Sequence, residues 1–193
     1  MKSSVKEIIK TTLALFLIAV AASSLLALAN SKTEPIIEQL QAQKEIESRK
    51  QVLPSADSFS ETQEASNGTL WCEGRSSGGE TAGYVINATV SSYGGKLTVM
   101  VGIEKSGLIT GVEILEINDT PALGMNAKEA SWLGQYEGKQ TDGDFRFFVT
   151  KDGSTAEGAI NAITAATISS NAVTSAVNMA IDTFNEIGGA ENG

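Results

Sequence analysis

The chain has 193 residues, 14 of them basic and 23 acidic, which gives a formal charge of −9. This negative balance argues against nucleic acid as a partner, because its phosphates are bound through Lys and Arg. With no histidine and one cysteine, Cys72, the sequence excludes a Ser-His-Asp triad, a His-ligated metal or haem, an internal disulfide and an iron–sulfur cluster, so redox work would need an organic cofactor.

The first predicted element is a charge-free apolar run, Thr11–Ala29. Its length of about 19 residues matches what a helix needs to cross the hydrocarbon of a bilayer. Three lysines within residues 1–10 precede it, so the positive-inside rule predicts a cytoplasmic N-terminus and an outer location for the rest. Ala27-Leu28-Ala29 also fits a signal-peptide cleavage site, but signal peptides have shorter apolar runs, so we favour an uncleaved transmembrane helix over residues 11–29 in a cell membrane.

Two polar segments follow the apolar run. The first, residues 30–54, is predicted to be a stalk helix that begins near Pro35 and ends before Pro54. The second, residues 55–80, is acidic and poor in apolar residues over most of its length, which favours a linker or loop.

Beyond residue 80 the hydrophobic period changes to two, which is typical of strands. Alternating runs at 84–92, 96–104 and 108–117 are separated by turns at Tyr93-Gly94-Gly95 and Lys105-Ser106-Gly107, and they predict a three-stranded antiparallel meander. Asp144–Thr150 predicts one more strand, and Asn126–Tyr136 predicts a short helix between the sheet elements. The predicted class is therefore α+β.

The last element is an amphipathic helix whose apolar residues recur at helical spacing from Val173 to Phe184. Ser169 or Ser170 is expected to cap its start, and Gly188-Gly189 to end it. The folded domain is thus predicted to span residues 81–188, followed by a tail at 189–193. A helix N-terminus rich in hydroxyl groups favours bound phosphate, although the same residues also suit simple capping.

The run from Asn161 to Ser169, "NAITAATIS", resembles the flavin-attachment motif of the FMN-binding domain family. That motif has an acidic residue, two variable residues, Ser or Thr, Gly, Ala, the acceptor Thr, a variable residue, and Ser or Thr. Thr167 falls on the acceptor. Ala165 replaces the motif glycine, and Asn161 replaces the acidic residue. The substitution of alanine matters if the backbone needs a positive φ there.

Other blocks agree with the same family in the same order. They are the Tyr93-Gly94-Gly95 turn with the strands after it, "DTPALG" at Asp119–Gly124, where Ala122 replaces a glycine, and "WLGQYEGK" at Trp132–Lys139. Together with the N-terminal apolar run, the likeness covers most of the chain. Within the family it is greatest to the G subunits of Rnf electron-transport complexes, which are related to the C subunit of the sodium-pumping NADH:quinone reductase.

The resemblance implies an FMN bound covalently by a phosphodiester to the Thr167 hydroxyl and attached by a separate flavin transferase. It assigns a cofactor-binding role to two groups of residues. The turn before the last helix contributes Thr164, Ala165, Ala166, Thr167, Ile168, Ser169 and Ser170, and the block at 119–124 contributes Thr120, Leu123 and Gly124. Tyr93 is expected in the core or a turn rather than against the flavin, and Trp132 is expected in the core.

The implied function is electron relay in an ion-translocating ferredoxin:NAD+ oxidoreductase, with other subunits and membrane lipid as partners and substrate chemistry elsewhere. An anchored binding or assembly module that has lost its flavin through Ala165 and Asn161 is the alternative from another class. A flavin reductase that acts alone outside the cytoplasm is a third.

Overall fold

The computed structural model describes residues 2–141 and 144–188. The chain divides into two compact units, Met1–Lys44 and Glu45–Gly193. The predicted tail at 189–193 lies outside the described residues.

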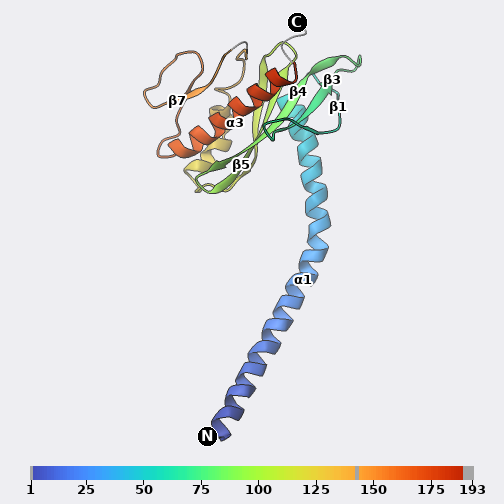
Figure 1. Cartoon of the computed structure of the whole chain (residues 1–193), viewed down its shortest axis with the longest axis vertical. Helices are drawn as coiled ribbons and strands as arrows, with labels where there is room; N and C mark the ends of the chain where they lie inside the picture. The colour runs from blue at the N-terminus through green and yellow to red at the C-terminus, as the bar shows by residue number, and fades with distance from the viewer. Residues whose placement is uncertain (1, 142–143, 189–193) are drawn as a thin grey trace. The chain divides into compact units, whose positions relative to one another are not determined.

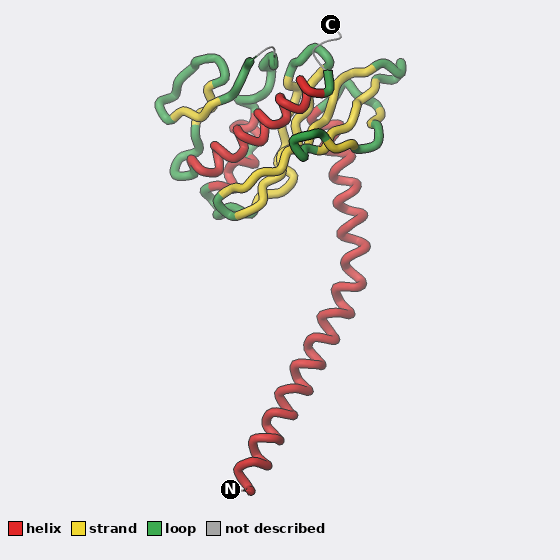
Figure 2. Tube along the Cα trace, viewed as in Figure 1, coloured by secondary structure: helices red, strands yellow, loops and turns green. Residues whose placement is uncertain are grey.

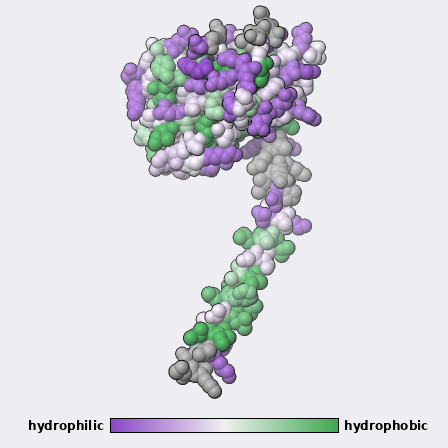
Figure 3. Space-filling view, viewed as in Figure 1, coloured by the Kyte–Doolittle hydropathy of each residue, from purple (hydrophilic) through white to green (hydrophobic). Residues whose placement is uncertain are grey.

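The N-terminal part of the chain is helical (Figure 1). Helix α1 (Lys2–Val52) is continuous across the two segments predicted as a transmembrane helix and a stalk. Pro35 lies inside this helix rather than at its start, in a sequence that otherwise favours helix on both sides. Residues Lys6–Glu34 are long and apolar enough to cross a membrane, and Figure 3 shows the hydrophobic surface along them. They fit a single-pass anchor.

The second unit is built on an antiparallel sheet (Figure 2). Its strands lie in the order β1-β3-β4-β5-β6, with β2 also paired to β3. The bounds are β1 Ser58–Phe59, β2 Gln63–Glu64, β3 Leu70–Arg75, β4 Thr81–Ser92, β5 Gly95–Glu104 and β6 Ile109–Ile117. The predicted meander is thus confirmed as β4-β5-β6, and the β4–β5 hairpin turns at Tyr93-Gly94, between paired Ser92 and Gly95.

Segment 55–80 is not the linker that its composition indicates, because it contains β1, β2 and β3. In β3 the side chain of Cys72 is buried, and burial, partly offset by Arg49, raises the pKa of its thiol. Leu70 and Arg75, at the two ends of this strand, are exposed. The strand is short and flanked by polar turns, so it lacks the long alternation that identified its neighbours.

The two faces of the sheet are covered by different helices. On one face, helix α3 (Thr167–Glu186) packs against β4 and β5 and buries Val173, Val177, Ile181 and Phe184 in the main core. On the other face, the end of α1 and the residues after it bury Val52, Leu53 and Ala56 against Cys72, Val85 and Met100. Within this unit the sheet therefore separates α3 from the end of α1.

Short elements connect β6 to α3. They are the 3-10 helix η1 (Gly124–Lys128), helix α2 (Ala130–Leu133), and the parallel pair β7 (Phe148–Thr150) and β8 (Ala159–Asn161). The predicted helix at 126–136 is therefore split in two, and the predicted strand at 144–150 begins only at Phe148. Phe145 and Phe147 precede it and pack edge-to-face, with ring centroids 4.9 Å apart.

Candidate functional site

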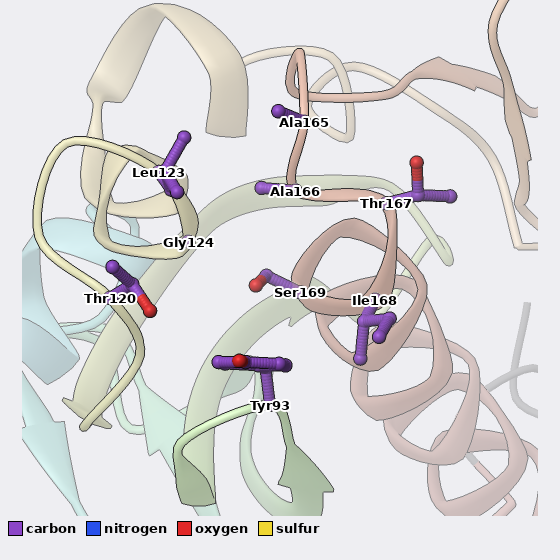
Figure 4. Close-up of a pocket in the computed structure, with 9 residues that line it drawn as sticks. All are labelled: Tyr93, Thr120, Leu123, Gly124, Ala165, Ala166, Thr167, Ile168 and Ser169. Atoms are coloured by element: carbon purple, nitrogen blue, oxygen red, sulfur yellow. The ribbon is translucent and has the colours of Figure 1, made fainter.

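Three segments that are distant in sequence surround a pocket at the start of α3 (Figure 4). The cavity measures about 410 Å³, a size within the range of small-molecule sites. The loop before η1 lies on one side, the start of α3 on the other, and the β4–β5 turn beneath. The lining residues are Tyr93, Thr120, Leu123, Gly124, Ala165, Ala166, Thr167, Ile168 and Ser169.

The loop before η1 is a tight turn. The amide of Leu123 donates a hydrogen bond of 3.2 Å to the carbonyl of Thr120, with Pro121 and Ala122 in the two central positions. Ala122 has φ = 58°. A turn with proline first and a positive φ second in the central pair is type II in character, and it prefers glycine where Ala122 stands.

The turn before α3 repeats this arrangement. The amide of Ala166 donates to the carbonyl of Ile163 at 3.0 Å, and Ala165 in the third position has φ = 60°. Ala122 and Ala165 are the non-glycine residues with positive φ in the described part of the chain. Both stand where the family motifs have glycine, so each turn carries the strain that glycine would avoid.

Helix α3 begins at Thr167, and no side chain of the described residues caps it. Ser169 and Ser170 lie inside the first turn, so the predicted capping role is wrong for both. The uncapped end leaves backbone N–H groups of the first turn free for a ligand, and the helix dipole favours an anion there. Thr167 is half-buried at the pocket edge.

The predicted cofactor residues lie in this pocket, with two exceptions. Thr164 lines a neighbouring groove of about 610 Å³, which shares Leu123 and Ala165 with the pocket. Ser170 is buried beneath the turn, where its hydroxyl accepts from the Ile163 amide and donates to the Ala166 carbonyl, both at 3.0 Å. Ser170 therefore shapes the turn and does not face the pocket.

Tyr93 lies in the pocket and not in the core. It stands at the β4–β5 turn, as expected, but the residue is 68% exposed, and Figure 4 shows its ring beneath the cavity. An exposed aromatic ring beside a cavity suits stacking on a planar ligand. The hydrophobic alternation of β4 could not predict the position of the Tyr93 side chain, because β4 ends at Ser92 and the alternation stops there.

Asp119 is a functional candidate that sequence reasoning did not select. The residue is 3% exposed, and its carboxylate accepts hydrogen bonds from the Ser92 hydroxyl at 2.5 Å and the Gly94 amide at 2.6 Å. Burial alone would raise the pKa of Asp119, but the bonds from Ser169, Ser92 and Gly94 outweigh it and lower the pKa. The sequence signal that could have selected Asp119 is its position as the first residue of the block "DTPALG".

Trp132 is only partly buried and packs at the edge of the main core. Its indole N–H donates to the carbonyl of Asn161 at 2.8 Å, and Gln135 accepts from the Asn161 amide at 2.8 Å. These bonds fix the strand that leads into the turn at Ala165.

The chemistry of the pocket is that of a binding site. The nine lining residues include no carboxylate, ammonium or guanidinium group. Among the described residues there is also no group of three or more Cys, Asp and Glu placed to hold a metal. Aromatic and aliphatic side chains, hydroxyl groups and a helix N-terminus remain, which suit a flat ring system that carries a phosphate.

Comparisons with known proteins agree with this site. The profile of the FMN-binding domain family matches residues 92–182. The chain is 35% identical to the G subunit of the Na(+)-translocating ferredoxin:NAD(+) oxidoreductase complex of Acetobacterium woodii, over 94% of each chain. It is 32% identical to the G subunit of the ion-translocating oxidoreductase complex of Methanosarcina acetivorans, over 93% of this chain and 96% of the other.

Solved structures show the same fold. The crystal structure of Shewanella oneidensis NqrC superposes with a TM-score of 0.52 at 17% identity, covering 68% of this chain and 69% of that one. The C subunit of the Na(+)-translocating NADH-quinone reductase from Parabacteroides distasonis gives a TM-score of 0.52 at 18% identity, covering 65% and 63%. With an FMN-binding domain and a match to these relatives over nearly its whole length, the chain belongs to the family of Rnf complex G subunits.

Proposed function

We propose that this protein is a membrane-anchored electron relay in an ion-translocating ferredoxin:NAD+ oxidoreductase complex, and that its FMN is joined by a phosphodiester to Thr167. The observation that carries the proposal is the position of Thr167. Its hydroxyl stands at the edge of the pocket, at the N-terminus of α3, in the acceptor position of the motif.

The residues of the pocket fit FMN in chemical kind. Tyr93, Leu123 and Ile168 offer exposed apolar surface for an isoalloxazine ring, and the first-turn amides of α3 suit a phosphate. When bound, FMN supplies the electron-carrying chemistry that the side chains lack. The chain's own part is to retain the cofactor, orient it and set its surroundings.

A covalent bond suits a site outside the cytoplasm. FMN has about 31 non-hydrogen atoms, and at about 0.3 kcal/mol each a good pocket yields roughly 9 kcal/mol, or a Kd of a few tenths of a micromolar. Free FMN outside the cell would be scarcer than that, so a reversibly bound cofactor would be lost. A tether at the phosphate retains it and leaves the ring to be tuned by the pocket.

The anchor gives the proposed orientation. Lys6 begins the apolar tract of α1, and Lys10 comes directly before its charge-free run. The positive-inside rule places both lysines in the cytoplasm. The domain that carries Thr167 would then face the other side of the membrane. Its partners would be the remaining subunits of the complex, a flavin transferase during maturation, and lipid around the helix.

The test is expression of the full chain with a flavin transferase, followed by denaturing electrophoresis under ultraviolet light and intact-mass measurement. The wild-type band should fluoresce and gain the mass of FMN less one water. Thr167→Ala should lose both signals, whereas the matched control Thr155→Ala, at an exposed threonine outside the motif and the pocket lining, should keep them. A fluorescent Thr167→Ala band would reject this acceptor.

An unmodified wild-type chain would instead favour the second candidate, an anchored assembly module without flavin. The observations that favour it are Ala165, strained at φ = 60°, and Asn161 in place of an acidic residue, since the transferase must read this turn. Restoring Ala165→Gly and Asn161→Asp together separates the cases. A gain of flavin only in the double variant would show that these departures block attachment.

A further inference from the structure

We propose that Asp119 is the positioning residue of the flavin pocket, holding the β4–β5 turn and the first turn of α3 at a fixed spacing and placing a carboxylate next to the pocket. This inference rests on the proposed function for the effect on the flavin, but the clamp itself belongs to the protein without cofactor.

The contacts of Asp119 join the three segments of the pocket. Both carboxylate oxygens accept hydrogen bonds from the β4–β5 turn, Oδ2 from the Ser92 hydroxyl and Oδ1 from the Gly94 amide. These residues flank Tyr93 on both sides. Ser169, in the first turn of α3, meets Asp119 beside Gly124, since a Cβ atom built on this glycine would lie 2.4 Å from the Ser169 hydroxyl oxygen and 2.8 Å from Oδ2 of Asp119. Thr120, the next residue in the chain, lines the pocket.

The packing around Asp119 allows little adjustment. A Cβ atom added to Gly124 would lie 2.4 Å from the Ser169 hydroxyl oxygen and 2.6 Å from Cβ of Asp119. A Cβ atom added to Gly94 would lie 2.0 Å from the carbonyl oxygen of Asn118. Glycine is required at both positions, because at Gly94 two backbone segments meet and at Gly124 the side chains of Ser169 and Asp119 occupy the space of a Cβ atom. The carboxylate therefore sits at a junction whose parts cannot shift independently.

The hydrogen-bond partners of Asp119 among the described residues are neutral hydroxyl and amide groups. The four ion pairs found among the described residues do not include Asp119. Its charge is therefore held in place without a neutralising cation. A fixed negative charge at low dielectric disfavours the addition of electrons nearby, so it should lower the reduction potential of a flavin in the pocket.

Two substitutions separate the bonds from the charge. Asp119→Asn keeps an oxygen that accepts from the Gly94 amide and an NH2 that donates to a serine hydroxyl, but it removes the charge. Asp119→Ala removes both. Asp57→Asn, on an exposed residue outside the pocket lining, is the matched control because it changes the net charge equally.

The first measurement is hydrogen exchange of the Gly94 amide in the full chain without flavin. Asp119→Asn should keep this amide slow. Asp119→Ala should speed its exchange by at least about tenfold, because a bond to a charged acceptor is lost. If the alanine variant does not fold, Ser92→Ala, which removes one of the bonds, should speed the same exchange to a smaller degree.

The second measurement is made on the flavin-loaded full chain. The visible circular dichroism of the flavin should change in Asp119→Ala and stay close to wild type in Asp119→Asn, because it reports the position of the ring. The reduction potential should rise in both variants and stay unchanged in Asp57→Asn. A general loss of stability would not produce this split between the two signals.

Gly94 exchange that is equally slow in Asp119→Ala would overturn the clamp. A reduction potential that is the same in wild type and Asp119→Asn would overturn the role of the charge. If the wild-type chain carries no flavin, the proposed function fails, and the exchange measurement still decides whether Asp119 positions the pocket.

Discussion

At the scale of single residues, the two strained alanines are the clearest departure from an ideal site. Ala122 and Ala165 each hold a positive φ in the third position of a turn, and both turns line the pocket or the groove beside it. A left-handed conformation costs a non-glycine residue about 1–2 kcal/mol. The fold retains both turns at that cost, so the surrounding contacts determine their shape.

Glycine at either position should therefore stabilise the protein. Ala165→Gly and Ala122→Gly should each raise the free energy of unfolding by about 0.5–1 kcal/mol, after the larger entropy of glycine in the unfolded chain is subtracted. Chemical denaturation of residues 45–193 measures it. Ala156→Gly, at an exposed alanine without a positive φ, should instead lower the free energy of unfolding by about a few tenths of a kcal/mol. Destabilisation by Ala165→Gly would contradict the strain.

Asp119 predicts a specific dependence of stability on pH. Its pKa is lower in the folded than in the unfolded chain, so its contribution is present above the unfolded pKa, near 4, and disappears as the pH falls through the folded value. The Tm of the wild type should exceed that of Asp119→Asn at pH 7, and the difference should shrink below about pH 4. Tm profiles that stay parallel down to about pH 2.5 would contradict this.

The sequence predicted most of the pocket at this scale, because the motif at 161–169 and the block at 119–124 are local patterns. It did not predict Tyr93 or Asp119. Their role depends on the β4–β5 turn meeting two other loops, and no pattern within one segment reports a contact across 25 residues such as that of Gly94 with Asp119.

At the scale of elements, the end of α1 fits into a notch made by two glycines. Gly102 in β5 and Gly111 in β6 are paired across the sheet, and a Cβ atom at Gly102 would lie 2.1 Å from the carbonyl oxygen of Val52. The same oxygen accepts a hydrogen bond of 2.5 Å from Thr110. The glycines thus allow the helix end to approach the backbone of the sheet.

Filling this notch should loosen the helix from the sheet. Gly102→Ala should lower the free energy of unfolding by about 1–3 kcal/mol, because the new methyl group meets backbone that cannot turn aside. Gly78→Ala is the control, since its Cβ atom would approach only a serine oxygen at 3.8 Å, and it should stay within about 0.5 kcal/mol. Equal denaturation midpoints for the two variants would disprove the close fit.

Elements with a long, regular hydrophobic period could be predicted from the sequence, whereas the short strands that depend on pairing with a neighbouring strand could not. The alternation of β4, β5 and β6 and the spacing of α3 each extend over nine residues or more. In contrast, β1 and β2 have two residues each and exist because β3 offers them its edge. The uncapped start of α3 also departs from the sequence pattern, because Ser170 is used inside the turn.

At the scale of the whole molecule, the boundary of the folded domain lies before the predicted one. The second compact unit begins at Glu45, and Val52 and Leu53 are buried in it, at 1% and 0% exposure. These residues belong to the end of α1 and the turn after it, which composition alone assigned to a stalk. The domain therefore includes the last turns of the helix.

Truncation tests this boundary. A chain that begins at residue 45 should fold cooperatively. In a chain that begins at residue 55, the free energy of unfolding should fall by about 4 kcal/mol or more, because the side chains of Val52 and Leu53 are missing from the core. Circular dichroism melting of both fragments measures the difference. Similar melting temperatures would show that the helix end is dispensable.

The seating of Val52 has a mechanical consequence. Any force that reaches the domain along α1 is applied to the face of the sheet opposite α3, where the load spreads over the hydrogen-bonded ladder between β5 and β6. The pocket loops join the ends of these same two strands, at Gly95 of β5 and Ile117 of β6. The ladder between β5 and β6 thus connects the packing site of Val52 with the pocket, so its rigidity would govern how far a displacement of Val52 reaches the pocket loops.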